Sequence, residues 1–150
     1  MATLTSKACA DNAPVVTPNQ AGTVVSQRGS LLIAVALVIA GTFIKLVTLP
    51  AGCVPASLVL DFDEIDGNAS PTTTAEFGIL NAAGDGFDVS AGTLTAVQLG
   101  AGGLQGALTA AFSRVAATTS DRVIAVKLGG TVATAKAGTV GATLGYRAKD

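Results

Sequence analysis

Histidine and tryptophan are missing from the sequence, and aromatic and charged residues are scarce. The 150 residues include 0 His, 0 Trp, 1 Tyr and 5 Phe, and 13% of them are charged. Without imidazole, neither a Ser/His/Asp nor a Cys/His catalytic arrangement is available, and the commonest metal ligand is absent. We therefore expect a protein that is not an enzyme and that binds no metal or other cofactor.

A strongly basic surface is also excluded by the composition. The chain has 9 Lys and Arg against 10 Asp and Glu, which gives a formal net charge of −1. Binding to nucleic acid depends on clustered cations that neutralise phosphates. We therefore expect no nucleic-acid partner.

Small residues supply most of the apolar character. The sequence is 49% hydrophobic and contains 18 Gly and 28 Ala. A chain of this length forms one domain, but small side chains bury little apolar area each, at about 25 cal/mol per Å². A monomer would be modestly stable, so we expect self-association to add to its stability.

The two cysteines, Cys9 and Cys53, do not form a recognisable metal motif, and no histidine complements them. We expect two free thiols, although the sequence leaves a disulfide between them open.

One apolar run, residues 31–40, stands out and continues without charge until Lys45. It is shorter than the roughly 20 residues of a membrane-spanning helix, and it starts too late for an ordinary signal peptide. We expect a buried strand or strand pair here and no membrane contact. The alternative is a membrane-anchored bacterial lipoprotein, because residues 49–53 (LPAGC) resemble a lipoprotein cleavage box, which predicts cleavage before Cys53.

Residues 1–30 contain several Pro, Asn and Gly and show little periodicity, so they predict an extended N-terminal arm with room for a short edge strand at residues 23–27. From residue 31 to residue 150, runs rich in β-branched residues alternate with Gly, Pro, Asn and Asp breaks, which is typical of a β-sandwich or jelly roll with six to eight strands.

Alternation with a period of two supports this fold class. Leu58, Leu60 and Phe62 share one face of a predicted strand, and Val140, Ala142, Leu144 and Tyr146 share the apolar face of the last one. The latter strand has small residues on its other face. For residues 103–117 the pattern fits a short helix or a strand equally well, and both remain open.

An acidic corner, defined here as Asp61, Asp63, Glu64 and Asp66, follows one predicted strand. Calcium binding has to be considered for such a cluster, but the spacing of an EF-hand is absent because the fifth and twelfth positions counted from Asp61 are not acidic. A solvated strand end or a polar contact surface explains the cluster better.

The order of charges along the chain separates two regions. Residues 46–113 contain seven acidic residues and no Lys or Arg, whereas residues 114–150 contain six Lys and Arg and two acidic residues. The charges of the two regions either pair between adjacent strands of one chain or pair between subunits, in which case Arg122 and Arg147 face a neighbour.

Four segments carry a resemblance to a known family. They are residues 43–66, with the motif LPAG at 49–52 and an aspartate-rich end; residues 69–80, which end in FGIL; residues 121–128; and residues 138–147. Together they resemble the small head-decoration, or cement, proteins of tailed bacteriophages.

The resemblance implies a mainly β protein, a jelly-roll-like antiparallel sandwich, that forms a homotrimer on the outer surface of a capsid at or near three-fold positions. It implies binding to the major capsid protein and stabilisation of the shell, with no active site. We expect the arm (residues 10–28), the acidic corner and the two arginines to make the contacts. The candidate residues are Val15, Val16, Arg28, Asp61, Asp63, Glu64, Asp66, Arg122 and Arg147.

A second alternative is a carbohydrate-binding or hydrolytic β-sandwich of a virion appendage. It predicts glycan binding that depends on Asp61, Asp63 or Tyr146. Sugar sites usually contain aromatic platforms, and the sequence has few residues to build one.

Overall fold

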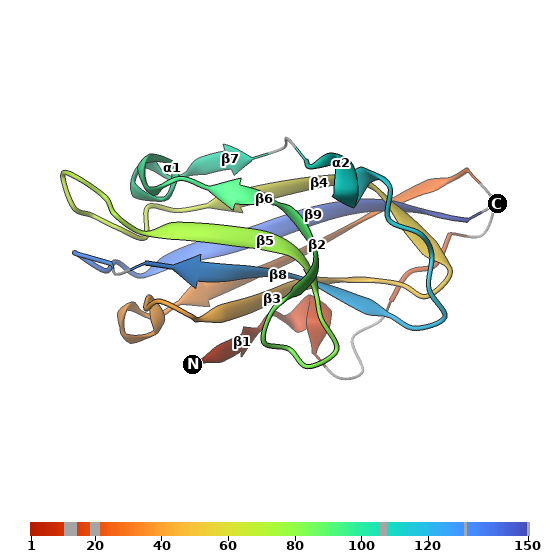
Figure 1. Ribbon diagram of the computed structural model, residues 1–150, viewed down its shortest axis with the longest axis horizontal. Helices are drawn as coiled ribbons and strands as arrows, with labels where there is room; N and C mark the ends of the chain where they lie inside the picture. Colours follow the sequence, from red (N-terminus) through yellow and green to blue (C-terminus); the bar gives the residue numbers. More distant parts are fainter. Residues whose placement is uncertain (11–14, 19–21, 106–107, 131, 150) are drawn as a thin grey trace.

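Two β-sheets pack face to face in the computed structural model of the protein, which describes residues 1–10, 15–18, 22–105, 108–130 and 132–149 (Figure 1). The five-stranded sheet contains, in order, β1 (Thr3–Thr5), β3 (Phe43–Leu49), β8 (Arg122–Gly129), β5 (Thr74–Leu80) and β6 (Phe87–Leu94). The four-stranded sheet contains, in order, β2 (Val24–Ile33), β9 (Gly138–Ala148), β4 (Cys53–Phe62) and β7 (Gly103–Gln105).

The strand order is that of a jelly roll. With β1 set aside, the two sheets are ordered 2-9-4-7 and 3-8-5-6, so the chain passes repeatedly from one sheet to the other. All neighbouring strands among these eight are antiparallel, and β1 is added in parallel at the edge beside β3. The predicted fold, a mainly β jelly-roll-like antiparallel sandwich, is confirmed.

The predicted apolar faces line the core between the sheets. Leu58, Leu60 and Phe62 of β4 are buried, as is the whole alternating set of β9 from Val140 to Tyr146. Because side chains of a strand alternate between faces, the small residues of β9 lie on the outer side of the four-stranded sheet. The period-two interpretation was therefore correct for both strands.

Much of the segment predicted as an N-terminal arm is built into the sandwich. Residues 3–5 form β1, and the buried Ser6 donates a hydrogen bond from its hydroxyl to the carbonyl of Leu46 on β3. Strand β2 pairs with β9 along all ten of its residues. The predicted boundary at residue 30 therefore falls inside β2, and the predicted edge strand at residues 23–27 extends to Ile33. Residues 11–14 and 19–21, which belong to the arm predicted to make contacts, lie outside the described residues.

Gly29 allows β2 of the four-stranded sheet to lie close to β3 of the five-stranded sheet. A Cβ atom at this position would lie 1.8 Å from the carbonyl oxygen of Leu46 and 3.0 Å from the Cβ of Ala8. Since no side chain fits there, β2 of one sheet approaches β3 of the other closely and holds the N-terminal residues against both.

The apolar run at residues 31–40 is not the buried strand or strand pair that we predicted. It covers the end of β2 and the 3-10 helix η2 (Val35–Leu37) before the chain enters β3. Leu32, Val35 and Ile39 are exposed to 70%, 50% and 48%. The run must turn the chain from one sheet to the other, so only some of its side chains reach the core, namely Leu31, Ile33, Leu37 and Val38. Within the described residues, no helix has the length and apolarity needed to cross a membrane.

Residues 103–117 contain both of the structures that the sequence left open. Strand β7 occupies Gly103–Gln105 and helix α2 occupies Ala110–Ser113. The side chain of Thr109 caps α2 by accepting a hydrogen bond from the backbone of Phe112, which is buried in the core. The remaining short helices are η1 (Lys7–Cys9) and α1 (Ala96–Ala101).

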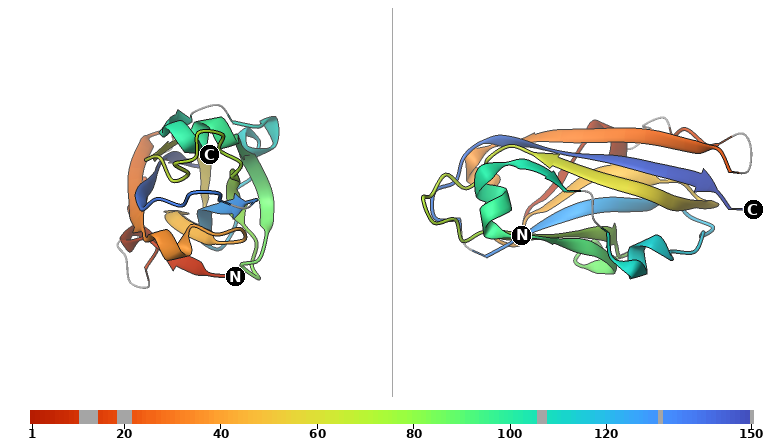
Figure 2. Two further views of the ribbon diagram at one scale, coloured as in Figure 1. Left: turned by 90° about the vertical axis from the view of Figure 1, so that its left-hand side faces the viewer. Right: turned by 90° about the horizontal axis from the view of Figure 1, so that it is seen from above.

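The sandwich is elongated, and different loops close its two ends (Figure 2). We call one the α1 end, where residues 34–42, 63–73, 95–102 and 132–137 lie. We call the other the C-terminal end, where the turn at residues 50–52 and the segment 114–121 lie near the end of β9. The candidate residues are distributed between these ends and the sheet that connects them.

Candidate functional site

The candidate contact residues lie in three places. Arg28 and Asp61 lie on the outer face of the four-stranded sheet. Asp63, Glu64 and Asp66 lie at the α1 end, and Val15, Val16, Arg122 and Arg147 lie toward the C-terminal end. The structure therefore does not gather them into one contact surface.

Arg28 and Asp61 form a two-pronged ion pair across β9. Arg28 Nη2 donates to Asp61 Oδ2 at 2.7 Å, and Arg28 Nη1 donates to Asp61 Oδ1. The pair crosses Gly141, where a Cβ atom would lie 2.9 Å from Arg28 Nη2 and from both carboxylate oxygens. A glycine at this position gives the two long side chains a shared path over the sheet. The pair is partly exposed to solvent, so it contributes little stability by itself.

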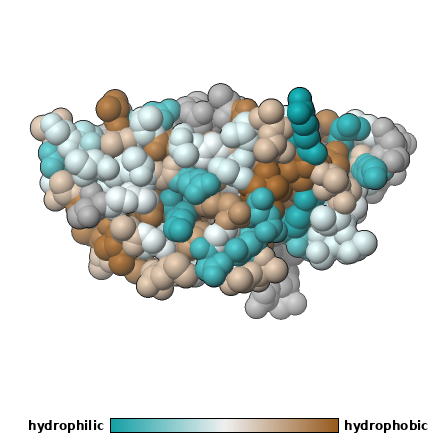
Figure 3. Space-filling view, in the orientation of Figure 1, coloured by the Kyte–Doolittle hydropathy of each residue, from teal (hydrophilic) through white to brown (hydrophobic). Residues whose placement is uncertain are grey.

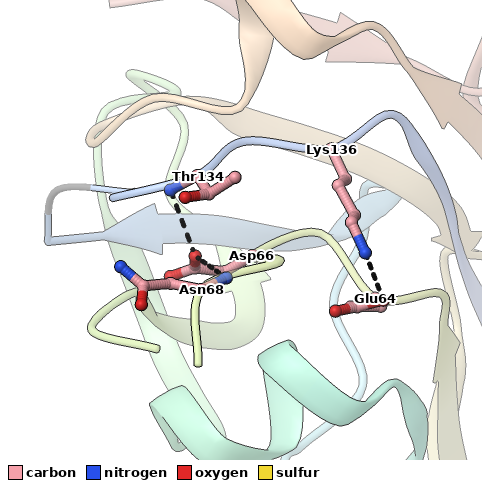
Figure 4. A network of polar contacts seen from close by, with 5 residues as sticks. All are labelled: Glu64, Asp66, Asn68, Thr134 and Lys136. Carbon is pink, nitrogen blue, oxygen red and sulfur yellow. Dashed lines mark hydrogen bonds and ion pairs between the residues drawn. The ribbon is translucent and has the colours of Figure 1, made fainter. Parts of the chain in front are cut away.

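Asp63 and Glu64 also have partners within the chain. Asp63 Oδ2 accepts a hydrogen bond from the backbone N–H of Thr139 at 2.7 Å. Glu64 Oε2 lies 2.7 Å from Lys136 Nζ (Figure 4). Lys136 belongs to the basic C-terminal region and Glu64 to the acidic middle region. This contact is the intrachain pairing that was one of the two interpretations of the charge order.

Asp66 is fully buried and organises the loops around it. Its carboxylate accepts hydrogen bonds from the backbone N–H groups of Asn68, Thr72, Thr73 and Thr134, at 3.2 to 3.4 Å. Figure 4 shows the bonds from Asn68 and Thr134. Burial by itself would raise the pKa of Asp66, but these hydrogen bonds together lower the pKa below its ordinary value. The carboxylate is therefore held in its charged form by backbone donors.

The acidic corner thus joins two loops of one chain. Backbone bonds reinforce the contact, from Gly67 N–H to the Thr134 carbonyl and from Lys136 N–H to the Ile65 carbonyl, at 2.8 and 3.0 Å. Among the described residues, no group of three or more His, Cys, Asp or Glu side chains is placed to hold a metal ion. All four corner carboxylates have partners within the chain, so the corner as seen here is a structural clasp.

Near the C-terminal end, the segment at residues 15–18 contacts the sandwich. The hydroxyl of the buried Tyr146 donates a hydrogen bond to the carbonyl of Val16, whose side chain is exposed. Val15 is partly buried. The segment is therefore attached to its own chain through the backbone of Val16.

Arg122 connects the two sheets at the C-terminal end. It begins β8 of the five-stranded sheet, and its Nη2 donates to the carbonyl of Cys53 on β4 of the other sheet at 3.2 Å. Its Nε is shielded from solvent and has no hydrogen-bond partner in the described structure. Burial lowers the pKa of Arg122.

Arg147, on β9, is exposed and pairs in register with Val24 and Val54.

Arg122 lines two adjoining hollows, which we call together the Arg122 groove. The larger, of about 660 Å³, lies between β6 and the region of α2, and the smaller, of about 410 Å³, lies beside the turn at residues 81–84. Both hollows are also lined by Asp88 and Thr118, and the larger is lined by Arg114. Sequence reasoning identified Arg122 but missed Arg114 and Asp88, because the groove depends on how α2 packs against β6.

Hydrophobic residues reach the surface at several places in Figure 3, which shows the side of the five-stranded sheet. One lies between β6 and α2, with hydrophilic residues at its edges, and corresponds to the Arg122 groove. Another lies at the lower left, over η2, where Val35 and Ile39 are exposed. Both are surfaces that contact with another molecule would bury.

Two features of the structure bear on the alternatives of a membrane-anchored lipoprotein and a carbohydrate-binding β-sandwich. Cys9 and Cys53 are free thiols, and Cys53 is buried at the start of β4. Cleavage before Cys53 would remove β1, β2 and β3 from both sheets. Tyr146 is buried with its hydroxyl bonded to Val16, so its ring is not presented as a platform for a sugar.

No model of a known protein family matches the sequence, and no curated protein matches it. Solved structures do show the fold. A chain in the structure of the capsid of Ralstonia phage GP4 is 25% identical, with a TM-score of 0.86, and the match covers 99% of both chains.

Two further capsid structures contain the same fold at lower identity. A chain of the cyanophage Pam1 capsid asymmetric unit is 18% identical, with a TM-score of 0.63, and the match covers 93% of this chain and 96% of that one. A chain of the acid-stable capsid of the Helicobacter pylori bacteriophage KHP30 is 13% identical, with a TM-score of 0.55, over 85% and 90% of the two chains. The protein therefore shares its fold, over nearly its full length, with a chain from a bacteriophage capsid.

Proposed function

We propose that this protein is a structural component of a bacteriophage virion that binds the outer surface of the capsid and bridges subunits of the major capsid protein. The observation that carries the proposal is the match to a chain of the Ralstonia phage GP4 capsid, which extends over 99% of both chains at 25% identity. The resemblance of the sequence to head-decoration proteins supports the finer assignment to a cement role on the outside of the shell.

The surface of the protein is suited to a role in assembly. Exposed apolar side chains, including Leu32, Val35, Ile39 and Val97, lie at or near the α1 end. Burying such side chains against a neighbour is favourable, at about 25 cal/mol per Å² of apolar area. As part of the same proposal, the protein has no catalytic activity and binds no cofactor, nucleic acid or membrane. It associates with itself as a homotrimer.

Stabilisation of the shell follows from mass action. A protein that binds the assembled shell and not its dissociated subunits stabilises the shell by RT ln(1 + [L]/Kd) per site, which is about 2.7 kcal/mol at a free concentration one hundred times Kd. Repetition over many equivalent sites makes this contribution large for the whole particle.

The proposal is tested by sedimenting purified shells that lack this protein together with increasing amounts of the full chain. We expect saturable retention at a fixed number of copies per major capsid protein, and labelled copies that remain accessible to antibody on intact shells. Analytical ultracentrifugation of the free protein tests the homotrimer. Failure of the protein to sediment with shells at any concentration would overturn the shell-binding role.

A further inference from the structure

The Arg122 groove combines an apolar floor with cationic side chains. Apolar residues of the larger hollow come from three elements of the chain, with Ile79 on β5, Val89 on β6 and Val115 after α2. Arg114 and Arg122 line the same hollow. Its volume of about 660 Å³ is in the range of about 300 to 1,000 Å³ that is typical of ligand sites.

The charge of Arg122 is unmatched in the described structure. The ion pairs found among the described residues are Arg28 with Asp61 and Lys136 with Glu64, and neither involves an arginine of the groove. Arg122 is partly buried, has one hydrogen bond to a carbonyl and has a shielded Nε without a partner. Within the described residues, Asp88 and Asp121 also line the groove, but neither forms an ion pair with Arg122. Withdrawing a guanidinium from water without an ion-pair partner is unfavourable, and an incoming anion would offset that cost.

The shape of the groove favours an extended occupant. The two hollows share Arg122, Asp88 and Thr118, so the groove continues past the arginine toward the turn at residues 81–84. Guanidinium groups bind carboxylates through paired hydrogen bonds. Asp88 at the junction and Asp121 in the smaller hollow disfavour an occupant with several negative charges, such as a polyphosphate, and leave a single carboxylate against the arginines of the larger hollow as the better fit.

We propose that the Arg122 groove binds an extended peptide segment of another shell protein, with an apolar side chain in the larger hollow and a carboxylate against Arg122 and Arg114. This inference rests on the proposed function, because it assumes that the partner is a protein of the capsid shell. It specifies which side chains of that partner would contact the groove. The occupant is a segment with an aspartate or glutamate next to a branched apolar residue.

The first test uses the isolated full chain and two peptide probes, acetyl-Leu-Glu-Leu-amide and acetyl-Leu-Gln-Leu-amide. We expect the Glu peptide to shift the NMR signals of Arg122 Nε–H and of the backbone near Val115, saturably at millimolar concentration, and the Gln peptide to bind at least about tenfold more weakly. R122Q should weaken binding of the Glu peptide by the same factor, and R114Q by about threefold because Arg114 is exposed. K7Q, which removes an exposed cation outside the groove, should change nothing.

Equal binding of both peptides, or no saturable shift with either, would overturn the proposal. R114Q keeps the test valid if R122Q does not fold. Retention on purified shells provides the second readout, and R122Q should weaken it by at least about tenfold while K7Q does not. If wild-type chain and R122Q are retained equally, the groove proposal fails and shell binding stands; if wild-type chain is not retained, the proposed function fails and the peptide result still decides the chemistry of the groove. Loss of self-association in R122Q would identify a second copy of the chain as the occupant and would contradict the assignment to another protein.

Discussion

The two ends of the sandwich are closed in opposite ways. At the α1 end, the buried carboxylate of Asp66 has four backbone donors, and the exposed pair of Glu64 and Lys136 lies beside it. At the C-terminal end, Arg122 connects the sheets with a single hydrogen bond to a carbonyl and lines an apolar groove. One end has its charges satisfied within the chain, and the other retains an unmatched cation.

We infer from this difference that the charges at the α1 end stabilise the fold, whereas the charge of Arg122 at the C-terminal end is available to bind a partner. A buried charge with complete hydrogen bonding fixes the loops around it, and its removal leaves several donors without a partner. A partly buried charge without an anion contributes nothing comparable to the fold and is available to a partner. Substitutions at the two ends should therefore change the free energy of unfolding by different amounts or in opposite directions.

Asp66→Ala should lower the free energy of unfolding by about 3 kcal/mol, because four backbone N–H groups lose their shared acceptor inside the clasp. Urea unfolding measures the change. Asp63→Ala is the matched control in the same corner and should cost about 1 kcal/mol, since its carboxylate accepts a backbone hydrogen bond from Thr139. Equal losses for the two variants would contradict the clasp at the α1 end.

The clasp should also depend on pH. The pKa of Asp66 is lowered in the folded protein, so its contribution is present above the unfolded pKa of about 3.9 and is lost as the pH falls through the lower folded value. The stability difference between wild type and Asp66→Asn should therefore be largest near neutral pH and shrink below about pH 4. Urea unfolding of the two proteins near neutral pH and below about pH 4 measures this difference. A stability difference that grows in acid would contradict a charged, hydrogen-bonded Asp66 in the folded protein.

Tyr146→Phe should cost about 1 kcal/mol, because it removes a buried hydroxyl and leaves the carbonyl of Val16 without this donor. The ring stays in place, so the variant isolates the hydrogen bond. We expect limited proteolysis near residues 15–18 to accelerate. Unchanged cleavage would show that the segment is held by other contacts.

Arg122→Met should leave the free energy of unfolding unchanged within about 0.5 kcal/mol or raise it, because relief of a partly buried charge without an ion-pair partner offsets the one hydrogen bond lost, to the Cys53 carbonyl. Arg28→Met is the matched control at a paired arginine and should lower stability by up to about 1 kcal/mol. A loss of more than about 2 kcal/mol at Arg122 would show that its charge is needed by the fold itself.

Glu64→Gln should change stability by no more than about 0.5 kcal/mol, because the ion pair with Lys136 is exposed to solvent. A double-mutant cycle with Lys136→Gln measures the coupling. A coupling energy above about 1 kcal/mol would mean that the exposed pair contributes to the clasp together with Asp66.

The sequence was sufficient to predict the regular part of the fold. Alternation of Leu58, Leu60 and Phe62, and of residues 140–146, predicted strands with one buried face, and the core contains these side chains. It was insufficient for residues 31–40, where hydrophobicity predicted burial but the chain turns between sheets and exposes Val35 and Ile39. Hydrophobicity alone does not encode where a strand ends.

The sequence predicted only part of the candidate site, because the partners of its residues come from distant parts of the chain. The acidic corner was recognised by composition, but its partners, such as the backbone of Thr134, come from a loop far along the chain. Arg122 was recognised from the order of charges, whereas Arg114 and Asp88 join it only through the packing of α2 on β6. Local patterns identify elements, and tertiary packing decides which polar groups remain unmatched.

The most direct test of the central claim is the thermal stability of purified shells measured by calorimetry with and without the full chain. If the protein is a structural component that binds the assembled shell, saturating protein should raise the temperature of shell disruption, and the rise should increase with the logarithm of free protein concentration. A disruption temperature that is the same at every protein concentration would contradict the account.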